Sequence, residues 1–187
     1  MKVIGFYTIN TPYEQEAEEF KKSLDEHSIP YHLYPVDNKG KWEVNCSLKS
    51  KVLRQALAEH DDNILYLDVD ARIVRKPPFE EIEKDIPGYI VWHPKFRPEG
   101  QLASGTIYIP NNDLGRKVLD AWIEEQDKDL TVWDQDTLFK VYKRFDHFLL
   151  HHDWCNIVRF REDRPLIETE SPIILHTQAS RRNKGKV

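Results

Sequence analysis

The sequence predicts an α/β protein whose central sheet is mostly parallel and is covered by helices on both faces. Short apolar runs alternate with longer amphipathic segments, and no repeat, linker or low-complexity segment interrupts them. The chain has 187 residues, 40% hydrophobic and 11% aromatic, which is enough for one sizeable core, so we expect one domain over residues 1–187. Strands that alternate with helices favour parallel pairing, and ligands of such sheets gather at the carboxyl ends of the strands.

The alternation starts at the N-terminus. The apolar run at 3–8 predicts a strand, and residues 12–26 predict a helix with acidic residues in its early turns, where the helix dipole favours them. A second strand is predicted at 31–36, followed by a helix with one apolar face at 48–60. The next predicted strand is ILYLDVDARIV at 64–74, whose apolar run ends in two aspartates.

The rest of the chain continues with shorter elements. They are a short helix at 79–84, strands at 89–92, 106–109 and 173–175, and helices at 114–125 and 134–143. A polar loop at 94–101 follows the strand at 89–92.

Composition and charge exclude several classes of protein. The net charge is −5, and the basic residues are spread along the chain except for the run at 181–186, so no nucleic-acid partner is expected. Cys46 and Cys155 match no CxxC pattern and are expected to be reduced. No basic-then-apolar leader and no bilayer-length apolar run occurs, so we expect a cytoplasmic protein without a membrane span.

The stretch Asp68-Val69-Asp70 allows three interpretations. Two aspartates can simply cap a strand and start a turn. They can be the nucleophile and the acid/base of a phosphohydrolase of the haloacid-dehalogenase type, but that motif usually lies on the first strand, and no second acidic pair follows Ile157 at a strand end. Alternatively, they hold a divalent cation whose remaining positions go to diphosphate oxygens.

Other motifs surround the aspartates in a fixed order. They are a first-strand loop TINTPY (8–13), a lysine-bearing helix (48–60), the small-residue strand LASGTI (102–107), WDQD (133–136), HDWCN (152–156) and a closing ILH (174–176). This order resembles that of the GT-A fold nucleotide-sugar glycosyltransferases and, among them, the retaining family 8 enzymes to which glycogenin belongs. The resemblance spans nearly the whole chain and implies their fold, a mostly parallel central sheet flanked by helices.

The resemblance implies a nucleotide-binding side of the site. The uridine would be held by three residues of the first loop, Thr8, Asn10 and Tyr13. A turn followed by a helix start explains that loop equally well. The lysine that reaches the nucleotide would be Lys51, with Lys49 and Arg54 as neighbours that could take its place, whereas the alternative for Lys51 is a solvated surface charge.

The donor sugar would contact the next two motifs. Ser104 and Gly105 let the backbone approach the sugar closely, although Ala103 stands where the family usually has Asn. Asp134 would bind hydroxyls of the sugar and Gln135 would lie near the anomeric carbon; a helix N-cap is the alternative role for Asp134.

The resemblance also implies a metal centre. Asp68, Asp70 and His176 would bind Mn²⁺ or Mg²⁺, and Asp68 would also contact the nucleotide sugar. Arg181 and Arg182, with Lys184 beyond them, would replace the lysine that the family uses to stabilise the departing diphosphate.

The implied function is metal-dependent transfer of a sugar from a nucleoside diphosphate donor, UDP-linked, to an acceptor hydroxyl, with retention. The acceptor is not encoded in any readable motif; it would meet loops such as 94–101. A sugar-nucleotide binding module without transfer activity, or a phosphohydrolase, would be the alternatives.

Overall fold

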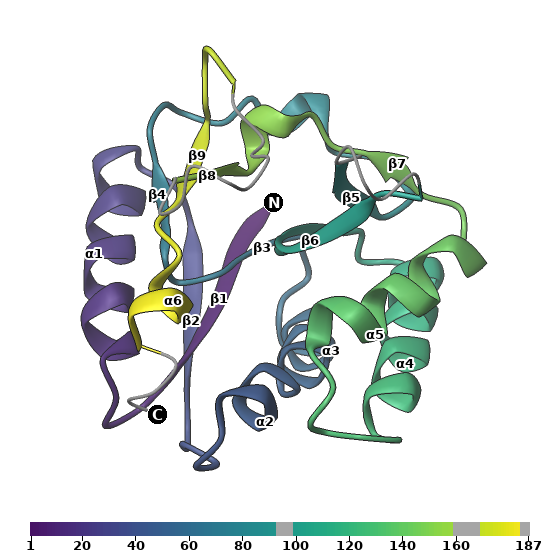
Figure 1. Ribbon diagram of the computed structural model, residues 1–187. Coiled ribbons are helices and arrows are strands. Elements are labelled where there is room, and N and C mark those ends of the chain that lie inside the picture. The colour runs from purple at the N-terminus through teal and green to yellow at the C-terminus, as the bar shows by residue number, and fades with distance from the viewer. Residues whose placement is uncertain (93–98, 159–168, 184–187) are drawn as a thin grey trace.

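The computed structural model describes residues 1–92, 99–158 and 169–183, and its centre is a six-stranded sheet with the order β2-β1-β3-β6-β5-β7 (Figure 1). The strands are β1 (Lys2–Thr8), β2 (Tyr31–Val36), β3 (Ile64–Leu67), β5 (Gly88–Trp92), β6 (Gln101–Ile109) and β7 (Phe148–Leu149). β1 runs parallel to β2 and β3, and β5 runs parallel to β7. Only β6 is antiparallel to its neighbours, β3 and β5, so the sheet is mostly parallel, as predicted.

A second, three-stranded sheet has the order β4-β9-β8 and was not predicted. It contains β4 (Ala71–Ile73), β8 (Asn156–Ile157) and β9 (Ile174–His176). The stretch 64–74 is therefore two strands in two sheets. The backbone N–H of Ala71 donates to the carbonyl of Asp68 at 2.8 Å, and this turn redirects the chain from β3 into β4. β4 then pairs antiparallel with β9, which joins the middle of the chain to its C-terminal part.

The helices lie on both faces of the central sheet, as predicted. They are α1 (Tyr13–Glu26), α2 (Trp42–Cys46), α3 (Lys49–Glu59), α4 (Asp113–Gln126), α5 (Asp134–Val141) and α6 (Ala179–Asn183), with 3₁₀ turns η1 (Phe79–Glu81), η2 (Tyr142–Arg144) and η3 (His152–Trp154). α1 and α6 lie together on one side of the sheet, and α3, α4 and α5 on the other (Figure 1). The helix predicted at 134–143 ends as an α-helix at Val141, and its last residues form η2.

Two apolar cores fill the space between the sheet and these helices. Along β3, Leu65 and Leu67 pack into the core under α1, whereas Ile64 and Tyr66 pack into the core under α3 and α4. Successive side chains of a strand point to opposite faces, so a strand buried on both faces must be apolar throughout. The first polar side chain after this run is Asp68, at the carboxyl edge of the sheet, where ligands of α/β proteins bind.

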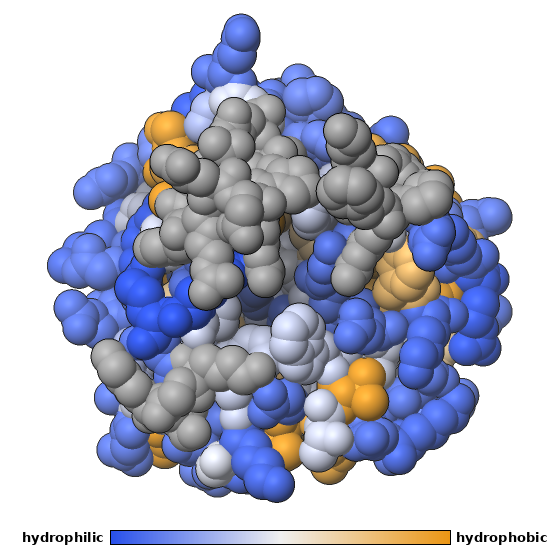
Figure 2. Space-filling view, viewed as in Figure 1, coloured by the Kyte–Doolittle hydropathy of each residue, from blue (hydrophilic) through white to orange (hydrophobic). Residues whose placement is uncertain are grey.

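The outer surface is mainly hydrophilic on the face drawn in Figure 2, where apolar side chains emerge in small separate patches. Within the described ranges, none of the helices has the length and apolar character needed to cross a bilayer.

Candidate active site

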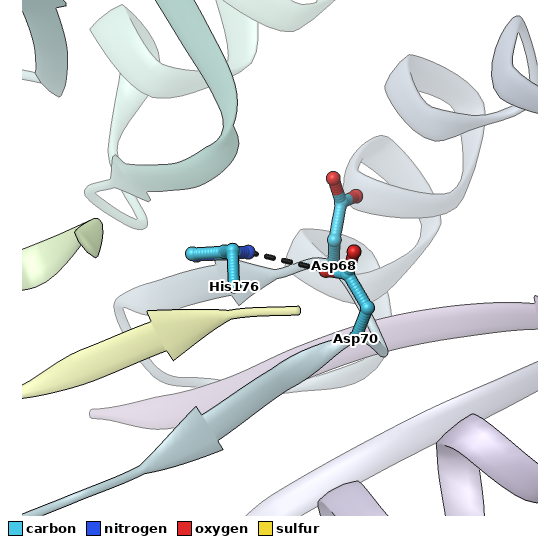
Figure 3. Close-up of side chains that lie close together, drawn as sticks. All are labelled: Asp68, Asp70 and His176. Carbon is cyan, nitrogen blue, oxygen red and sulfur yellow. Dashed lines mark hydrogen bonds and ion pairs between the residues drawn. The ribbon is translucent and has the colours of Figure 1, made fainter. Parts of the chain in front are cut away.

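Three potential metal ligands from distant parts of the sequence meet beside the central sheet. Asp68 and Asp70 lie in the turn between β3 and β4, and His176 is the last residue of β9. The pairing of β4 with β9 sets Ala71 opposite His176, which brings the aspartates and the histidine together. One ligand atom from each of the three residues lies within 4.8 Å of the others, and their side chains gather as Figure 3 shows.

Hydrogen bonds fix two of these ligands. The Nδ1 atom of His176 is 3.2 Å from Oδ1 of Asp70, and the other ring nitrogen, Nε2, is 3.0 Å from the hydroxyl of Thr106. The second carboxylate oxygen of Asp70 accepts the backbone N–H of Ala179, at the start of α6, at 2.9 Å. The ring nitrogen that faces the aspartates is therefore Nδ1, the atom that a cation would share with them.

The protonation of this pair follows from its burial and its charges. Burial raises the pKa of Asp70, but the interactions with His176, the backbone N–H of Ala179 and Arg72 together lower it more, so the net pKa lies below the ordinary value. Burial lowers the pKa of His176, whereas Cys155 and Asp70 raise it, and the net pKa lies well above the ordinary value. A ligating imidazole must be neutral, so a divalent cation bound here would take the place of the ring proton.

Asp68 is held from two directions, and Gly105 leaves space beside it. Its Oδ1 accepts the hydroxyl of Tyr66 at 2.6 Å, and its backbone N–H donates to the carbonyl of Gly105 at 3.0 Å. A Cβ atom at position 105 would lie 3.1 Å from Oδ2 of Asp68 and 3.1 Å from Cε1 of His176. The absent side chain of Gly105 therefore keeps room next to two of the three ligands.

A buried lysine connects the candidate metal ligand Asp68 to the start of α5. The ammonium group of Lys49 lies 3.0 Å from Oδ1 of Asp68 and 2.7 Å from Oδ2 of Asp134, and it donates to the carbonyl of Ser104 at 3.1 Å. Only 4% of Lys49 is exposed. Burial lowers the pKa of Lys49, but the carboxylates of Asp134 and Asp68 raise it above the ordinary value, so the ammonium group is charged. Lys49, Asp68 and Asp134 form one network.

The lysine chosen from the sequence, Lys51, is not in this network. Its ammonium group pairs with Asp127 at 2.7 Å, and both side chains are about half exposed. Residues two apart on a helix point in different directions, so Lys49 and Lys51 cannot both face the site. A signal for Lys49 existed in the sequence, because Lys49 lies on the same helical face as Val52, Leu53 and Ala56, which are buried. Such a charged residue within an apolar stripe needs a buried partner.

The DQD segment reaches the same network. Asp134 is the first residue of α5 and is 5% exposed, and the N-cap position belongs to Trp133, whose side chain makes no capping hydrogen bond. Asp134 is thus not the helix cap, which was its alternative role. Gln135 accepts the backbone N–H of Ser104 at 3.3 Å, so β6 and α5 are joined next to Lys49.

The first loop lies at the carboxyl end of β1. Thr8 is buried, and its hydroxyl lies 2.9 Å from that of Thr11. Asn10 is exposed and has a left-handed backbone with φ 57°. The hydroxyl of Tyr13 accepts the indole N–H of Trp42 at 3.1 Å. Burial raises the pKa of Tyr13, and the charges of Asp70 and Asp68 add to this shift.

The two predicted arginines lie on α6. Arg182 donates to the carbonyl of Thr177 at 2.7 Å and to Oε1 of Glu16 on α1 at 2.6 Å, and Arg72 donates to the other oxygen of Glu16 at 2.8 Å. Glu16 thus ties the segment after Asp70 to the segment after His176, and Arg182 serves in that tie. Arg181 is exposed on the same short helix.

Two sequence-based expectations concern residues that the structure does not fully describe. Lys184 and residues 94–98 of the polar loop at 94–101 lie outside the described residues.

Comparisons with known proteins agree with this architecture. No protein-family profile and no curated protein sequence matches the chain. Among solved structures, a glycosyltransferase involved in the glycosylation of the major capsid of PBCV-1 superposes with a TM-score of 0.70 at 12% identity, over 98% of this chain and 97% of that one.

Two further glycosyltransferases have the same fold over most of this chain. The glycosyltransferase GlyE of Streptococcus pneumoniae TIGR4 gives a TM-score of 0.61 at 18% identity and covers 94% of this chain, which spans about half (54%) of GlyE. The galactosyltransferase LgtC, solved in complex with donor and acceptor sugar analogs, gives 0.57 at 12% identity, over 94% of this chain and 86% of LgtC. The chain therefore has the GT-A-like fold of glycosyltransferases that its motif order predicted.

Proposed function

We propose that this protein is a metal-dependent glycosyltransferase that transfers a sugar from a UDP-linked donor to an acceptor hydroxyl with retention, as family 8 enzymes do, within one domain formed by residues 1–187. The observation that carries the proposal is the meeting of Asp68, Asp70 and His176 within 4.8 Å at the carboxyl edge of a glycosyltransferase-like sheet. Carboxylates and one imidazole form a donor set suited to Mn²⁺ and acceptable to Mg²⁺.

The residues fit such a cation in two respects. Their ligand atoms come from two aspartates and one histidine, and these atoms lie within 4.8 Å of one another. Gly105 leaves the space beside Asp68 and His176 open, since a Cβ atom would approach both at 3.1 Å. When bound, the metal supplies Lewis-acid stabilisation of the charge that develops on the diphosphate.

Other residues would bind the different parts of the donor. Thr8, Asn10 and Tyr13 would bind the uridine, and Asp134 would accept hydrogen bonds from hydroxyls of the donor sugar. Lys49 would take the role that the sequence suggested for Lys51. The contacts of Lys49 with both Asp68 and Asp134 support this assignment. The ammonium group of Lys49 offsets the negative charge of both carboxylates, which lie 3.0 Å and 2.7 Å from it.

Further donor contacts would come from β6 and α6. Ser104 and Gly105 would lie against the donor sugar, and Gln135 near its anomeric carbon. Arg181 would stabilise the diphosphate, whereas Arg182 would act indirectly, because its guanidinium holds α6 to Glu16.

The transfer step exchanges one bond at the anomeric carbon. The bond from that carbon to the diphosphate oxygen breaks, and its electron pair leaves with UDP. The acceptor oxygen forms the new glycosidic bond, and its proton passes to the departing diphosphate. Charge therefore collects on the diphosphate, which explains the need for positive charge on that side of the site.

The test is a calorimetric titration of UDP, GDP and ADP into the protein with and without Mn²⁺. UDP is expected to bind in preference to the other two and only weakly without the metal, because the first loop resembles a uridine-binding type. Equal binding of all three nucleotides would refute the UDP assignment, and no nucleotide binding under any condition would refute the function.

Turnover separates the alternatives. A transferase releases UDP from a UDP-sugar when an acceptor is present. Without an acceptor it releases UDP slowly, by transferring the sugar to water. A binding module would hold the UDP-sugar intact over the same period, and a phosphohydrolase would release phosphate from simple phosphate esters.

A further inference from the structure

One large aromatic side chain stands exposed beside the proposed donor site. In the described part of the chain, the large apolar residues that are more than a third exposed are Val74, Leu130, Trp133, Leu149 and Val158. Trp133 is 45% exposed and directly precedes Asp134, the buried carboxylate that pairs with Lys49. An indole ring buries more apolar area than any other side chain when a ligand covers it.

The position of Trp133 is set by contacts on both its backbone and its ring. Its carbonyl accepts the backbone N–H groups of Asp136 at 3.0 Å and Thr137 at 3.1 Å, which fixes it at the start of α5. Its ring meets the ring of Trp42 edge to face, with centroids 5.7 Å apart and an interplanar angle of 85°. A rigidly placed aromatic residue binds a ligand with little loss of side-chain entropy.

Trp42 joins this ring to the rest of the site. It lies on α2, is only partly buried, and donates its indole N–H to the hydroxyl of Tyr13, one of the residues proposed to bind the uridine. Cys46, at the other end of α2, is close enough to Asp134 and Lys49 for their charges to act on its thiol, whose pKa is raised chiefly by burial. α2 and the start of α5 therefore flank the same site.

We propose that Trp133, supported by Trp42, is the acceptor subsite and binds the pyranose ring of a carbohydrate acceptor. This inference rests on the proposed function. A pyranose ring presents a face of C–H groups that packs against an indole, while its hydroxyls stay in water at the rim of the site. An acceptor bound to Trp133 would lie next to Asp134, the following residue, which is proposed to hold the donor sugar.

The exposed indole favours a sugar over the nucleobase as its ligand. The first loop already supplies an aromatic ring for the base, that of Tyr13. Trp42 donates a hydrogen bond to the hydroxyl of Tyr13 and so belongs to the base side of the site. Trp133 adjoins the donor-sugar residue Asp134 instead. A ligand on Trp133 would therefore meet the reacting end of the donor.

The test combines direct sugar binding with kinetics. Protein labelled with fluorotryptophan gives one fluorine NMR resonance for each of its 5 tryptophans, and Trp133→Phe identifies the one from Trp133. Methyl glucosides, methyl galactosides and the disaccharides maltose and lactose are then titrated with and without UDP and Mn²⁺. The Trp133 resonance is expected to shift saturably with at least one of these sugars.

The kinetic arm uses Trp133→Ala with Leu130→Ala as its matched control, because Leu130 lies in the same connection before α5 and is 40% exposed. In Trp133→Ala, the KM for the responding sugar is expected to rise about tenfold or more, which corresponds to about 1.4 kcal/mol of binding free energy, while UDP affinity stays within about twofold of wild type. Leu130→Ala is expected to leave the KM unchanged. Thermal unfolding of each variant checks that the fold is intact.

Three results would each overturn the inference. The first is the absence of any sugar-dependent shift of the Trp133 resonance. The second is wild-type transfer to sugars by Trp133→Ala, and the third is transfer by the wild type only to hydroxyls of a serine-containing peptide. Failure of the proposed function is separate, because it appears as a lack of UDP binding with Mn²⁺, and the sugar titration without nucleotide still decides whether Trp133 binds a pyranose.

Discussion

Replacing Lys49 by methionine is expected to destabilise the fold by about 3 to 5 kcal/mol. The substitution removes the ammonium group that lies 2.7 Å from Asp134 and 3.0 Å from Asp68, but keeps most of the side-chain volume. Asp134 is only 5% exposed, so its carboxylate would be left buried without a cation. Removing one partner of a buried ion pair has a cost of about 3 to 5 kcal/mol in measured cases.

The lower half of that range is the better expectation. The side chain of Asp68 is 38% exposed and keeps its hydrogen bond from Tyr66. Water and the tyrosine therefore compensate part of the lost ion pair between Asp68 and Lys49. The lost hydrogen bond to the carbonyl of Ser104, 3.1 Å long, accounts for about 1 kcal/mol within that range. We therefore expect a loss near 3 kcal/mol.

Urea unfolding followed by circular dichroism measures this loss, and Lys51→Met is the control. The pair of Lys51 with Asp127 is about half exposed on both sides, and such pairs contribute about 0 to 1 kcal/mol. Asp134→Asn combined with Lys49→Met should recover part of the stability, since the uncompensated charge is gone. Equal losses for the two lysine variants, or strict additivity in the double variant, would show that Lys49 is not the centre of a buried charge network.

Three further predictions concern the metal ligands, the α1–α6 tie and alkaline pH. Asp70→Ala and His176→Ala should each weaken Mn²⁺-dependent UDP binding, and the double variant should be little worse than either, because each removes a ligand of one ion; calorimetry showing additive losses would contradict a shared ion. Glu16→Gln should weaken Mn²⁺ binding by loosening α6, whereas Glu19→Gln should not, because Glu19 is exposed and pairs with Lys22; equal Mn²⁺ affinities of the two variants would exclude this role of Glu16. Above about pH 10 the free energy of unfolding should fall steeply, because in the unfolded chain tyrosines ionise near pH 10 while burial keeps several protonated in the fold; that of Tyr108 has its pKa raised to about 12. Urea unfolding at several alkaline pH values, with tyrosinate absorbance as a second probe, measures this fall, and a flat profile would contradict it. The tyrosines with raised pKa through burial are Tyr13, Tyr31, Tyr34, Tyr66, Tyr89 and Tyr108.

The sequence by itself determined the layer order and the position of the aspartates. The strand at 31–36 has the predicted bounds, and the predicted helix at 12–26 is α1 with one residue fewer. Local patterns suffice for such elements, because the period of the apolar residues records which face of a strand or helix is buried. The end of the apolar run at Leu67 likewise placed Asp68 at the edge of the sheet, and the order of motifs predicted the fold.

Tertiary structure alone decided how these elements are joined and which charged groups meet. The break between β3 and β4 depends on pairing with β9, a strand more than a hundred residues away, and no local pattern specifies that partner. Lys49 rather than Lys51 enters the charge network, because the face of α3 that bears Lys49 is turned toward the carboxylates of Asp68 and Asp134. Arg182 binds Glu16 because α6 packs on α1, a contact across 166 residues of sequence. Periodicity tells which side of an element is buried, but charge pairing depends on distances between elements, and only the folded chain sets those distances.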